Sequence, residues 1–199
     1  MDIKFFDKWS TEGIEVKEPG LKRYINVSPI LVPKTHGRHS SKQFYKSGIS
    51  LVERLMNHMM TPGHRGKRQV ICSRKLTGKT ATIWKATKEA FTIIENKLKK
   101  NPIEVLVRAV ENAALREEVT SFRLGGIVGR KAVISSPQRR IDLALRLITQ
   151  ASFQKSHGKG KKIANVLAAE IIACYENDAS KATAIREKER IEREAAGSR

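Results

Sequence analysis

One stretch of the chain, residues 117–140, constrains the fold more than any other; it reads EEVTSFRLGGIVGRKAVISSPQRR. Two apolar-rich runs flank Gly125-Gly126, and a glycine pair between such runs is typical of a tight β-hairpin turn. Helical patterns dominate elsewhere, so the hairpin is an exception in a helical chain. After Glu117 and Glu118 the stretch holds no acidic residue. The sequence therefore predicts a basic β-hairpin at about residues 118–135 that projects from a helical body.

Apolar residues at helical spacing predict about five or six helices. The first starts near Ser47 or Ser50 and ends at Thr61-Pro62-Gly63, and the second carries an apolar face that ends before residue 100. Asn101-Pro102, with Glu104 following, has the pattern of a helix start with a capping box. Ser136-Pro137 starts another helix, and two more follow the loop QKSHGKGKK. The last helix has only a thin apolar stripe, so it either docks on the body or becomes ordered against a partner.

The first 46 residues contain several Gly and Pro residues and only short apolar patches. This pattern predicts an extended N-terminal arm, in which a short strand is one option. A chain of 199 residues is long enough for one substantial domain. The expected architecture is therefore mainly α: a single helical domain over residues 47–199, a protruding β-hairpin arm, and an extended arm over residues 1–46.

Charge is the strongest functional signal in the composition. The chain has 39 Lys and Arg against 20 Asp and Glu, a net charge of +19. Between Pro19 and Lys88 the only acid is Glu53, and between Val119 and Ala169 it is Asp142. Solvated surfaces usually mix both signs, so tracts of one sign favour a surface that faces phosphates. With 40% hydrophobic residues the chain can still form a packed core, which favours a folded nucleic-acid-binding protein over a basic tail.

Several other classes are disfavoured. The sequence has no run of 18 apolar residues and no secretory leader, so we expect neither a membrane partner nor secretion. Cys72 and Cys174 are expected to be reduced, buried thiols in a cytoplasmic protein. His36 and His39 form an H-x-x-H pattern, but their basic neighbours would repel a cation, so no metal site is predicted.

A nucleotide-dependent enzyme is also disfavoured. Gly78-Lys79-Thr80 resembles the end of a phosphate-binding loop, but Ser73 stands where that motif needs its first glycine. The acids lie on helix faces and in the C-terminal segment, with no evident catalytic pair. We therefore predict no enzymatic activity, no cofactor and no small-molecule substrate.

Two readings of the basic hairpin remain open. Its cations could only protect strand edges from pairing, or the ribbon could contact RNA or DNA, because glycines near the turn let it approach a backbone closely. Arg139 and Arg140 oppose the dipole of the helix that they start, and a bound phosphate would explain their position. Aromatic residues make up only 6% of the chain, so binding should rest on phosphates and shape. A DNA-binding architectural protein with a basic ribbon is the alternative to an RNA-binding protein.

Five segments carry a resemblance to a known family. They are NPIEVLVRAVENAALREE, FRLGGIVGRKAV, SSPQRRIDLALRLI, IANVLAAEIIACYEN and SKATAIREKERIEREA. In this order they resemble the universal small-subunit ribosomal protein seven family, in its archaeal-type form. The resemblance implies a structural protein of the cytoplasmic ribosome that binds the 3′ major domain of 16S ribosomal RNA and nucleates assembly of the subunit head. It also implies a hairpin near tRNA and mRNA at the exit site, with neighbouring head and platform proteins as partners.

The resemblance also implies site residues. Contacts to ribosomal RNA would come from Arg38, Lys42, Lys46, Arg65, Lys67, Arg68, Arg74, Lys75, Lys79, Arg139, Arg140, Lys155, Lys159, Lys161 and Lys162. The exit-site hairpin would use Arg123, Gly125, Gly126, Arg130 and Lys131. The chain lacks the highly basic segment that precedes the first helix in the bacterial form, and its longer arm carries spaced cations instead.

Overall fold

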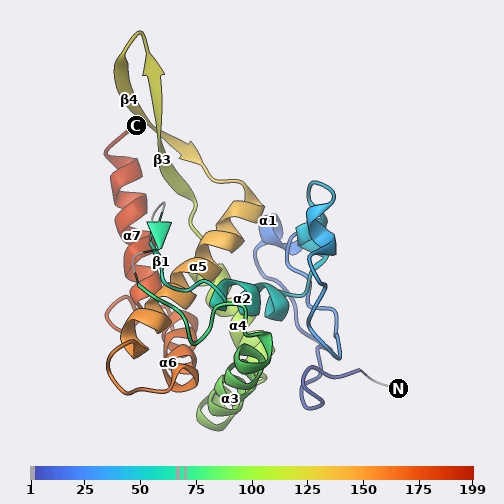
Figure 1. Cartoon of the computed structure of the whole chain (residues 1–199). Coiled ribbons are helices and arrows are strands. Elements are labelled where there is room, and N and C mark those ends of the chain that lie inside the picture. Colours follow the sequence, from blue (N-terminus) through green and yellow to red (C-terminus); the bar gives the residue numbers. More distant parts are fainter. Residues whose placement is uncertain (1–2, 66–67, 70) are drawn as a thin grey trace.

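The structure is a computed structural model that describes residues 3–65, 68, 69 and 71–199; the side chains of residues 64, 65, 68 and 69 lie outside this description. Figure 1 shows a helical body from which one long hairpin projects. The elements are α1 (Pro19–Lys22), η1 (Arg38–Ser40), η2 (Tyr45–Gly48), α2 (Leu51–Met59), β1 (His64–Arg65), β2 (Arg68–Gln69), α3 (Thr80–Leu98), α4 (Pro102–Ala113), β3 (Glu117–Leu124), β4 (Ile127–Ile134), α5 (Pro137–Ser156), α6 (Ile163–Tyr175) and α7 (Thr183–Ala196). The mainly α fold with a hairpin is confirmed, and α2 to α7 are the six helices longer than one turn within the described residues.

Helix α6 lies at the centre of the body. It packs against α3, α4, α5 and α7, and it is apolar around most of its circumference, as expected for a helix surrounded by others. Helix α4 is similarly buried, whereas α5 is amphipathic and turns Ile141, Leu145 and Ile148 towards the core. These helices enclose one hydrophobic core, to which α2 and α3 also contribute.

Helix α4 begins where the sequence predicts. The Asn101 side-chain oxygen accepts a hydrogen bond from the Ile103 backbone N–H at 3.0 Å, and Pro102 occupies the first turn. Glu104 does not complete the capping box, since no hydrogen bond joins it to Asn101 in the described part of the chain. The Asn101 amide instead donates to the Ser10 carbonyl at 2.6 Å, which ties the N-terminal segment to α4.

The N-terminal segment is anchored in the core by aromatic rings. Phe6 and Trp9 pack edge-on to Phe91 of α3, with ring centroids 5.9 and 5.7 Å apart, and the Trp9 indole N–H donates to Glu95. No strand forms among residues 3–46; α1 and two 3₁₀ turns take its place, and a single bridge from Asn26 to Ser50 is the only β-pairing with later residues in the described part of the chain. The segment is therefore extended between anchored points, and the boundary at residue 46 stays a prediction.

The hairpin has the predicted position and turn. Strands β3 and β4 pair from Glu117 opposite Ile134 to Leu124 opposite Ile127. Gly125 and Gly126 both have positive φ, 53° and 92°, which this tight turn requires and which glycine adopts at little cost.

Helix α7 docks beside the base of the hairpin (Figure 1), so the docked option for the last helix is confirmed. Ala184 and Ile185 are buried against the body. Past the end of the helix, the Ser198 carbonyl accepts a hydrogen bond from the Ala132 N–H of β4 at 3.2 Å, and Arg199 pairs with Glu117 of β3 at 2.7 Å. The C-terminus thus braces the root of the arm.

The two cysteines differ. Cys174 on α6 is buried as expected, and burial raises the pKa of its thiol. The expectation for Cys72 is wrong: it is exposed, because it lies in the irregular segment that leads to α3 and not in a packed helix or strand. No helix among the described residues is long and apolar enough to cross a membrane.

Candidate nucleic-acid interface

The pairing register places the hairpin cations on both faces of the ribbon. Arg130 lies opposite Ser121, so it shares a face with Arg123, while Lys131 lies opposite Thr120 on the other face. All three side chains are exposed, and none forms an ion pair within the described residues. The cations are therefore available to an external anion on either side of the arm.

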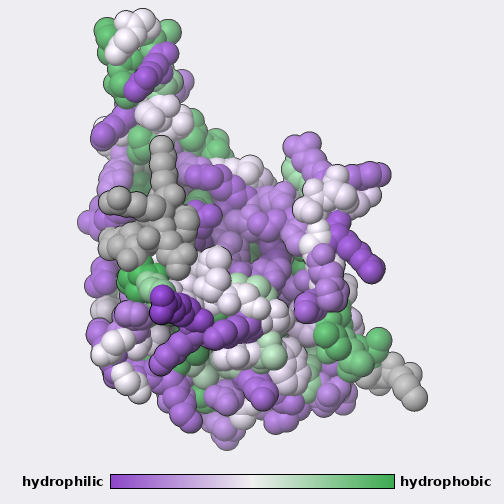
Figure 2. Space-filling view, in the orientation of Figure 1, coloured by the Kyte–Doolittle hydropathy of each residue, from purple (hydrophilic) through white to green (hydrophobic). Residues whose placement is uncertain are grey.

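The tip of the hairpin is apolar, which the sequence analysis did not anticipate. Phe122, Leu124, Ile127 and Val128 are all exposed there, with Ile127 76% accessible. Figure 2 shows this hydrophobic tip above a largely hydrophilic face. The Phe122 ring lies directly over Gly129 and explains why this position has no side chain. A Cβ at position 129 would lie 2.6 Å from that ring. The signal was present in the sequence, because large apolar residues stand on both sides of the Gly125-Gly126 turn.

The two arginines that start α5 have partners inside the protein. Arg139 forms a forked pair with both carboxylate oxygens of Glu118, and this hydrogen bonding is the main cause of the lowered pKa of Glu118. Arg140 donates to the Leu115 carbonyl at 2.7 Å and to Glu18 at 2.6 Å, and its side chain is only 12% exposed. A bound phosphate is not needed to explain them. Their contact with RNA stays a prediction, to which the half-exposed Arg139 is better suited.

The internal role of Arg140 gives a first prediction. Arg140→Ala should lower the free energy of unfolding by about 2 kcal/mol, because a carbonyl and a carboxylate lose a charged donor. Thermal or urea unfolding of the purified chain measures this change. The matched control is Arg146→Ala on the same helix, whose guanidinium forms no ion pair in the described structure and which should change stability much less. Equal stability of Arg140→Ala and the unmodified protein would show that Arg140 is free for another ligand.

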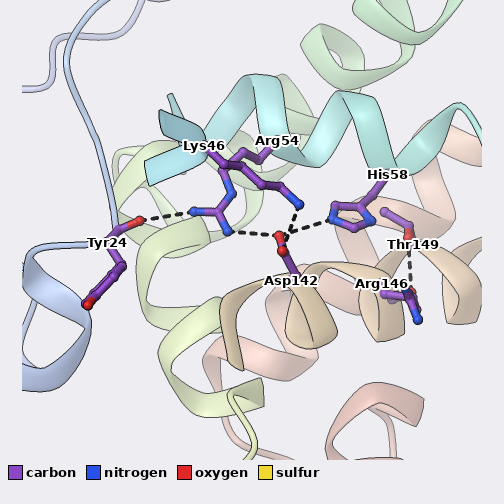
Figure 3. Close-up of polar contacts among 7 residues, drawn as sticks. All are labelled: Tyr24, Lys46, Arg54, His58, Asp142, Arg146 and Thr149. Atoms are coloured by element: carbon purple, nitrogen blue, oxygen red, sulfur yellow. Dashed lines mark hydrogen bonds and ion pairs between the residues drawn. The ribbon is translucent and has the colours of Figure 1, made fainter. Parts of the chain in front are cut away.

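Asp142, the lone acid of its tract, is a hub for two cationic side chains and a histidine (Figure 3). Its carboxylate accepts from Lys46 at 2.7 Å and from Arg54 at 2.9 Å, with His58 at 3.6 Å. Burial opposes ionisation of Asp142, but hydrogen bonds from His58, Lys46 and Arg54 outweigh it and hold its pKa well below the usual range. Lys46, a predicted RNA contact, is therefore partly committed to an internal pair. Sequence reasoning missed this hub, although one acid in a basic tract is the signal for it.

Glu53, the lone acid of the earlier tract, is also an internal brace. It is buried, and one of its oxygens accepts from both the backbone N–H and the hydroxyl of Thr35, each at 2.7 Å. With Glu53 and Asp142 both turned inwards, the described surface of these tracts shows cations with little opposing charge.

The lysines at the end of α5 and in the loop that follows it also divide into paired and unpaired side chains. Lys155 donates to the buried Glu170 at 2.5 Å and to the Lys181 carbonyl at 2.9 Å. Lys159, Lys161 and Lys162 are exposed and surround a hollow of about 780 Å³. These three lysines are available to contact phosphates, whereas Lys155 is engaged in an ion pair with Glu170 of α6.

The remaining predicted RNA contacts form two groups, one before α2 and one after it. Arg38 and Lys42 are exposed on the projection formed by η1 and η2, and Arg74, Lys75 and Lys79 are exposed on the loop before α3. Lys67 lies outside the described residues, and so do the side chains of Arg65 and Arg68. Gly78 and Lys79 directly precede α3, which begins at Thr80, and residues 71–79 are a turn-rich segment, not the strand and loop of a nucleotide site.

The cations do not gather in one patch. In Figure 1 the hairpin tip and the loop after α5 lie at opposite ends of the molecule, and the η1 and η2 projection lies on a third side. Hydrophilic side chains cover much of the face between the hairpin and this projection (Figure 2). A helical body with separate cationic regions and a ribbon arm defines a class of protein: a scaffold suited to a large, folded polyanion that contacts it at several places.

Comparisons with known proteins agree with this class and make it specific. The family model described as ribosomal protein S7p/S5e matches residues 21–199. "Small ribosomal subunit protein uS7" of Nanoarchaeum equitans is 43% identical over 199 residues, covering all of both chains. The proteins of the same name from Methanococcus maripaludis strains C7 and S2 are 43% and 42% identical, again over the full length of both chains.

The chain belongs to the ribosomal protein S7p/S5e family of small-subunit ribosomal proteins. It is thus a structural, non-enzymatic protein of the ribosome, with the ribosomal RNA binding and the role in translation that belong to the family. Membership also gives its location, the cytoplasm in which ribosomes work.

Proposed function

We propose that this chain organises the head of the small subunit by binding the 3′ major domain of 16S ribosomal RNA, and that its hairpin contributes to the exit site near tRNA and mRNA. Neighbouring head and platform proteins would be its protein partners. The observation that carries the proposal is the distribution of exposed cations over three sides of a helical body with one core. A single duplex would meet one such region, whereas a folded RNA domain can meet several at once.

The packing suggests different roles for the body and the hairpin. The body, with Lys159, Lys161 and Lys162 at one end, would hold the permanent RNA partner. The hairpin projects away from the body and carries unpaired cations on both faces, which suits ligands that come and go. Family membership favours RNA over the DNA-binding alternative. Gel shifts with structured RNA and duplex DNA of equal length distinguish the two.

Co-sedimentation tests the proposal. The tagged chain should migrate with small subunits in gradients of increasing salt, and it should remain there at salt concentrations that strip loosely bound basic proteins. Release at the same salt concentration as an unrelated basic protein of similar charge would contradict a structural role in the head.

The hairpin gives a second prediction. Replacing Arg123, Arg130 and Lys131 together with Ala should leave folding and subunit incorporation unchanged, because these side chains are exposed and form no ion pair within the described residues. Binding of deacylated tRNA to the exit site should weaken several-fold, measured by filter binding on purified subunits. The variant Arg123→Lys, Arg130→Lys, Lys131→Arg keeps the charge and should behave like the unmodified protein. Loss of incorporation would instead make the arm an assembly element.

A further inference from the structure

The η1 and η2 projection carries two exposed aromatic rings that phosphate contacts do not explain. Phe44 is 58% exposed and Tyr45 is 51% exposed, although aromatic side chains usually bury their rings. Phe44 also has a φ of 67°, a left-handed conformation that is uncommon for a bulky residue. The backbone at this point therefore holds a large apolar ring in solvent.

The rings are surrounded by unpaired cations. Lys34, Arg38 and Lys42 are exposed and form no ion pair within the described residues. The Lys42 ammonium lies 5.7 Å from the centre of the Tyr45 ring, within the range of a cation–π contact. Because Glu53 is buried against Thr35, the projection presents no carboxylate to a ligand.

Tyr45 also forms one wall of a cleft. The cleft has a volume of about 680 Å³, and its other walls include Lys34, His36, Arg38, His39 and Ile49. This volume lies within the roughly 300–1,000 Å³ of sites that hold small organic molecules. A planar heterocycle with an attached phosphate would find an aromatic wall, an apolar floor and cations at the rim.

We propose that this projection binds an unpaired segment of RNA, stacking bases on Phe44 and Tyr45 while Lys34, Arg38 and Lys42 hold the adjoining phosphates. The proposal rests on the proposed function, because it names the form of RNA that one part of the protein reads. An RNA duplex keeps its bases paired and stacked, so only an unpaired segment can offer base faces to these rings. An apolar protein partner would not require three unpaired cations, whereas aromatic rings among cations are the usual site for single strands. Such stacking would add to the phosphate and shape contacts that the low aromatic content led us to expect.

A fluorescent oligonucleotide tests the stacking directly. The probe is a single-stranded RNA hexanucleotide of uridines, which stack weakly, with one central 2-aminopurine, whose emission is quenched when it stacks on an aromatic ring. The full-length protein should bind this probe and quench it. The variant Phe44→Ala, Tyr45→Ala should bind at least about five-fold more weakly and lose most of the quenching. The slope of affinity against salt should stay the same, because no phosphate contact is removed.

The control removes exposed apolar area without removing a ring. Leu31→Ala, Val32→Ala lies in the same segment, where both side chains are about as exposed as Phe44. This variant should quench and bind like the unmodified protein, and thermal unfolding should show all three proteins equally folded. Equal binding and quenching by the Phe44→Ala, Tyr45→Ala variant would overturn the inference. So would a loss of affinity that appears only as a smaller salt slope.

The two proposals fail in different ways. If the unmodified protein prefers the 3′ major domain fragment but the ring variant binds the hexanucleotide normally, the stacking site is wrong and the proposed function stands. If the unmodified protein shows no preference for that fragment, the proposed function fails, whatever the hexanucleotide shows.

Discussion

Asp142→Asn should lower the free energy of unfolding by about 3 kcal/mol near neutral pH, the effect of breaking a buried ion pair by removing one partner. The Arg54 side chain is only 1% exposed, so in the variant its charge stays buried beside the Tyr24 carbonyl and a neutral amide, with no carboxylate to balance it. Lys46 and His58 face the same carboxylate, so they lose its negative charge as well (Figure 3). Chemical unfolding followed by circular dichroism measures the change.

The same pair predicts how stability depends on pH. The folded-state pKa of Asp142 lies below its unfolded value, which is about 4, so the ionised carboxylate stabilises the fold above that pH. This contribution is lost as the pH falls from about 4 towards the lowered folded-state pKa. The difference in stability between the unmodified protein and Asp142→Asn should therefore be constant near neutral pH and shrink below about pH 4.

Glu187→Gln is the matched control, since it makes the same chemical change on an exposed face of α7. Glu187 pairs with Arg190, whose side chain is 54% exposed, and such surface pairs contribute about 0.5 kcal/mol or less. If Asp142→Asn cost no more than Glu187→Gln, the hub would not brace α2 against α5.

The second large effect concerns RNA affinity. Replacing Lys159, Lys161 and Lys162 with Ala should weaken binding to the 3′ major domain on the order of 100-fold at 0.1 M salt. Three lost phosphate contacts should also reduce the slope of log affinity against log salt by roughly 2 to 3. The fold should be unaffected, because these side chains are exposed and Lys155 still holds Glu170. Filter binding over a series of salt concentrations measures both quantities.

A control of equal charge separates location from net charge. Lys4, Lys8 and Lys17 are exposed in the N-terminal segment, where acids are mixed among the cations. Their replacement by Ala should change the affinity and the salt slope much less. Equal losses from the two triple variants would show that only the total charge matters and that the loop after α5 is no particular site.

Local signals in the sequence predicted much of the fold. Asn101-Pro102 starts α4 and Gly125-Gly126 makes the hairpin turn, and each of these depends on the conformation of neighbouring residues alone. Contacts between distant residues could not be predicted in this way. Arg140 and Glu18 are 122 positions apart, and nothing near either residue indicates the other. The ring cluster that anchors the N-terminal segment on α3 also joins residues that are distant in sequence. The sequence therefore predicted only an extended arm there.

The candidate site shows the same limit. Tracts of one sign marked the cationic surface, but charge counts do not show which cations are already paired. Lys46, Lys155 and Arg140 all hold internal partners, whereas Lys159, Lys161 and Lys162 remain free within the described structure. The low aromatic content also concealed a local pair, since Phe44 and Tyr45 matter through their exposure and not their number.

Equilibrium binding of the full chain to a transcript of the 16S 3′ major domain, beside an unrelated RNA duplex of equal length, tests the central claim most directly. We expect a clear preference for the transcript at every salt concentration, with affinity for both RNAs falling as salt rises. Equal affinity for the transcript and the duplex across the series would contradict it.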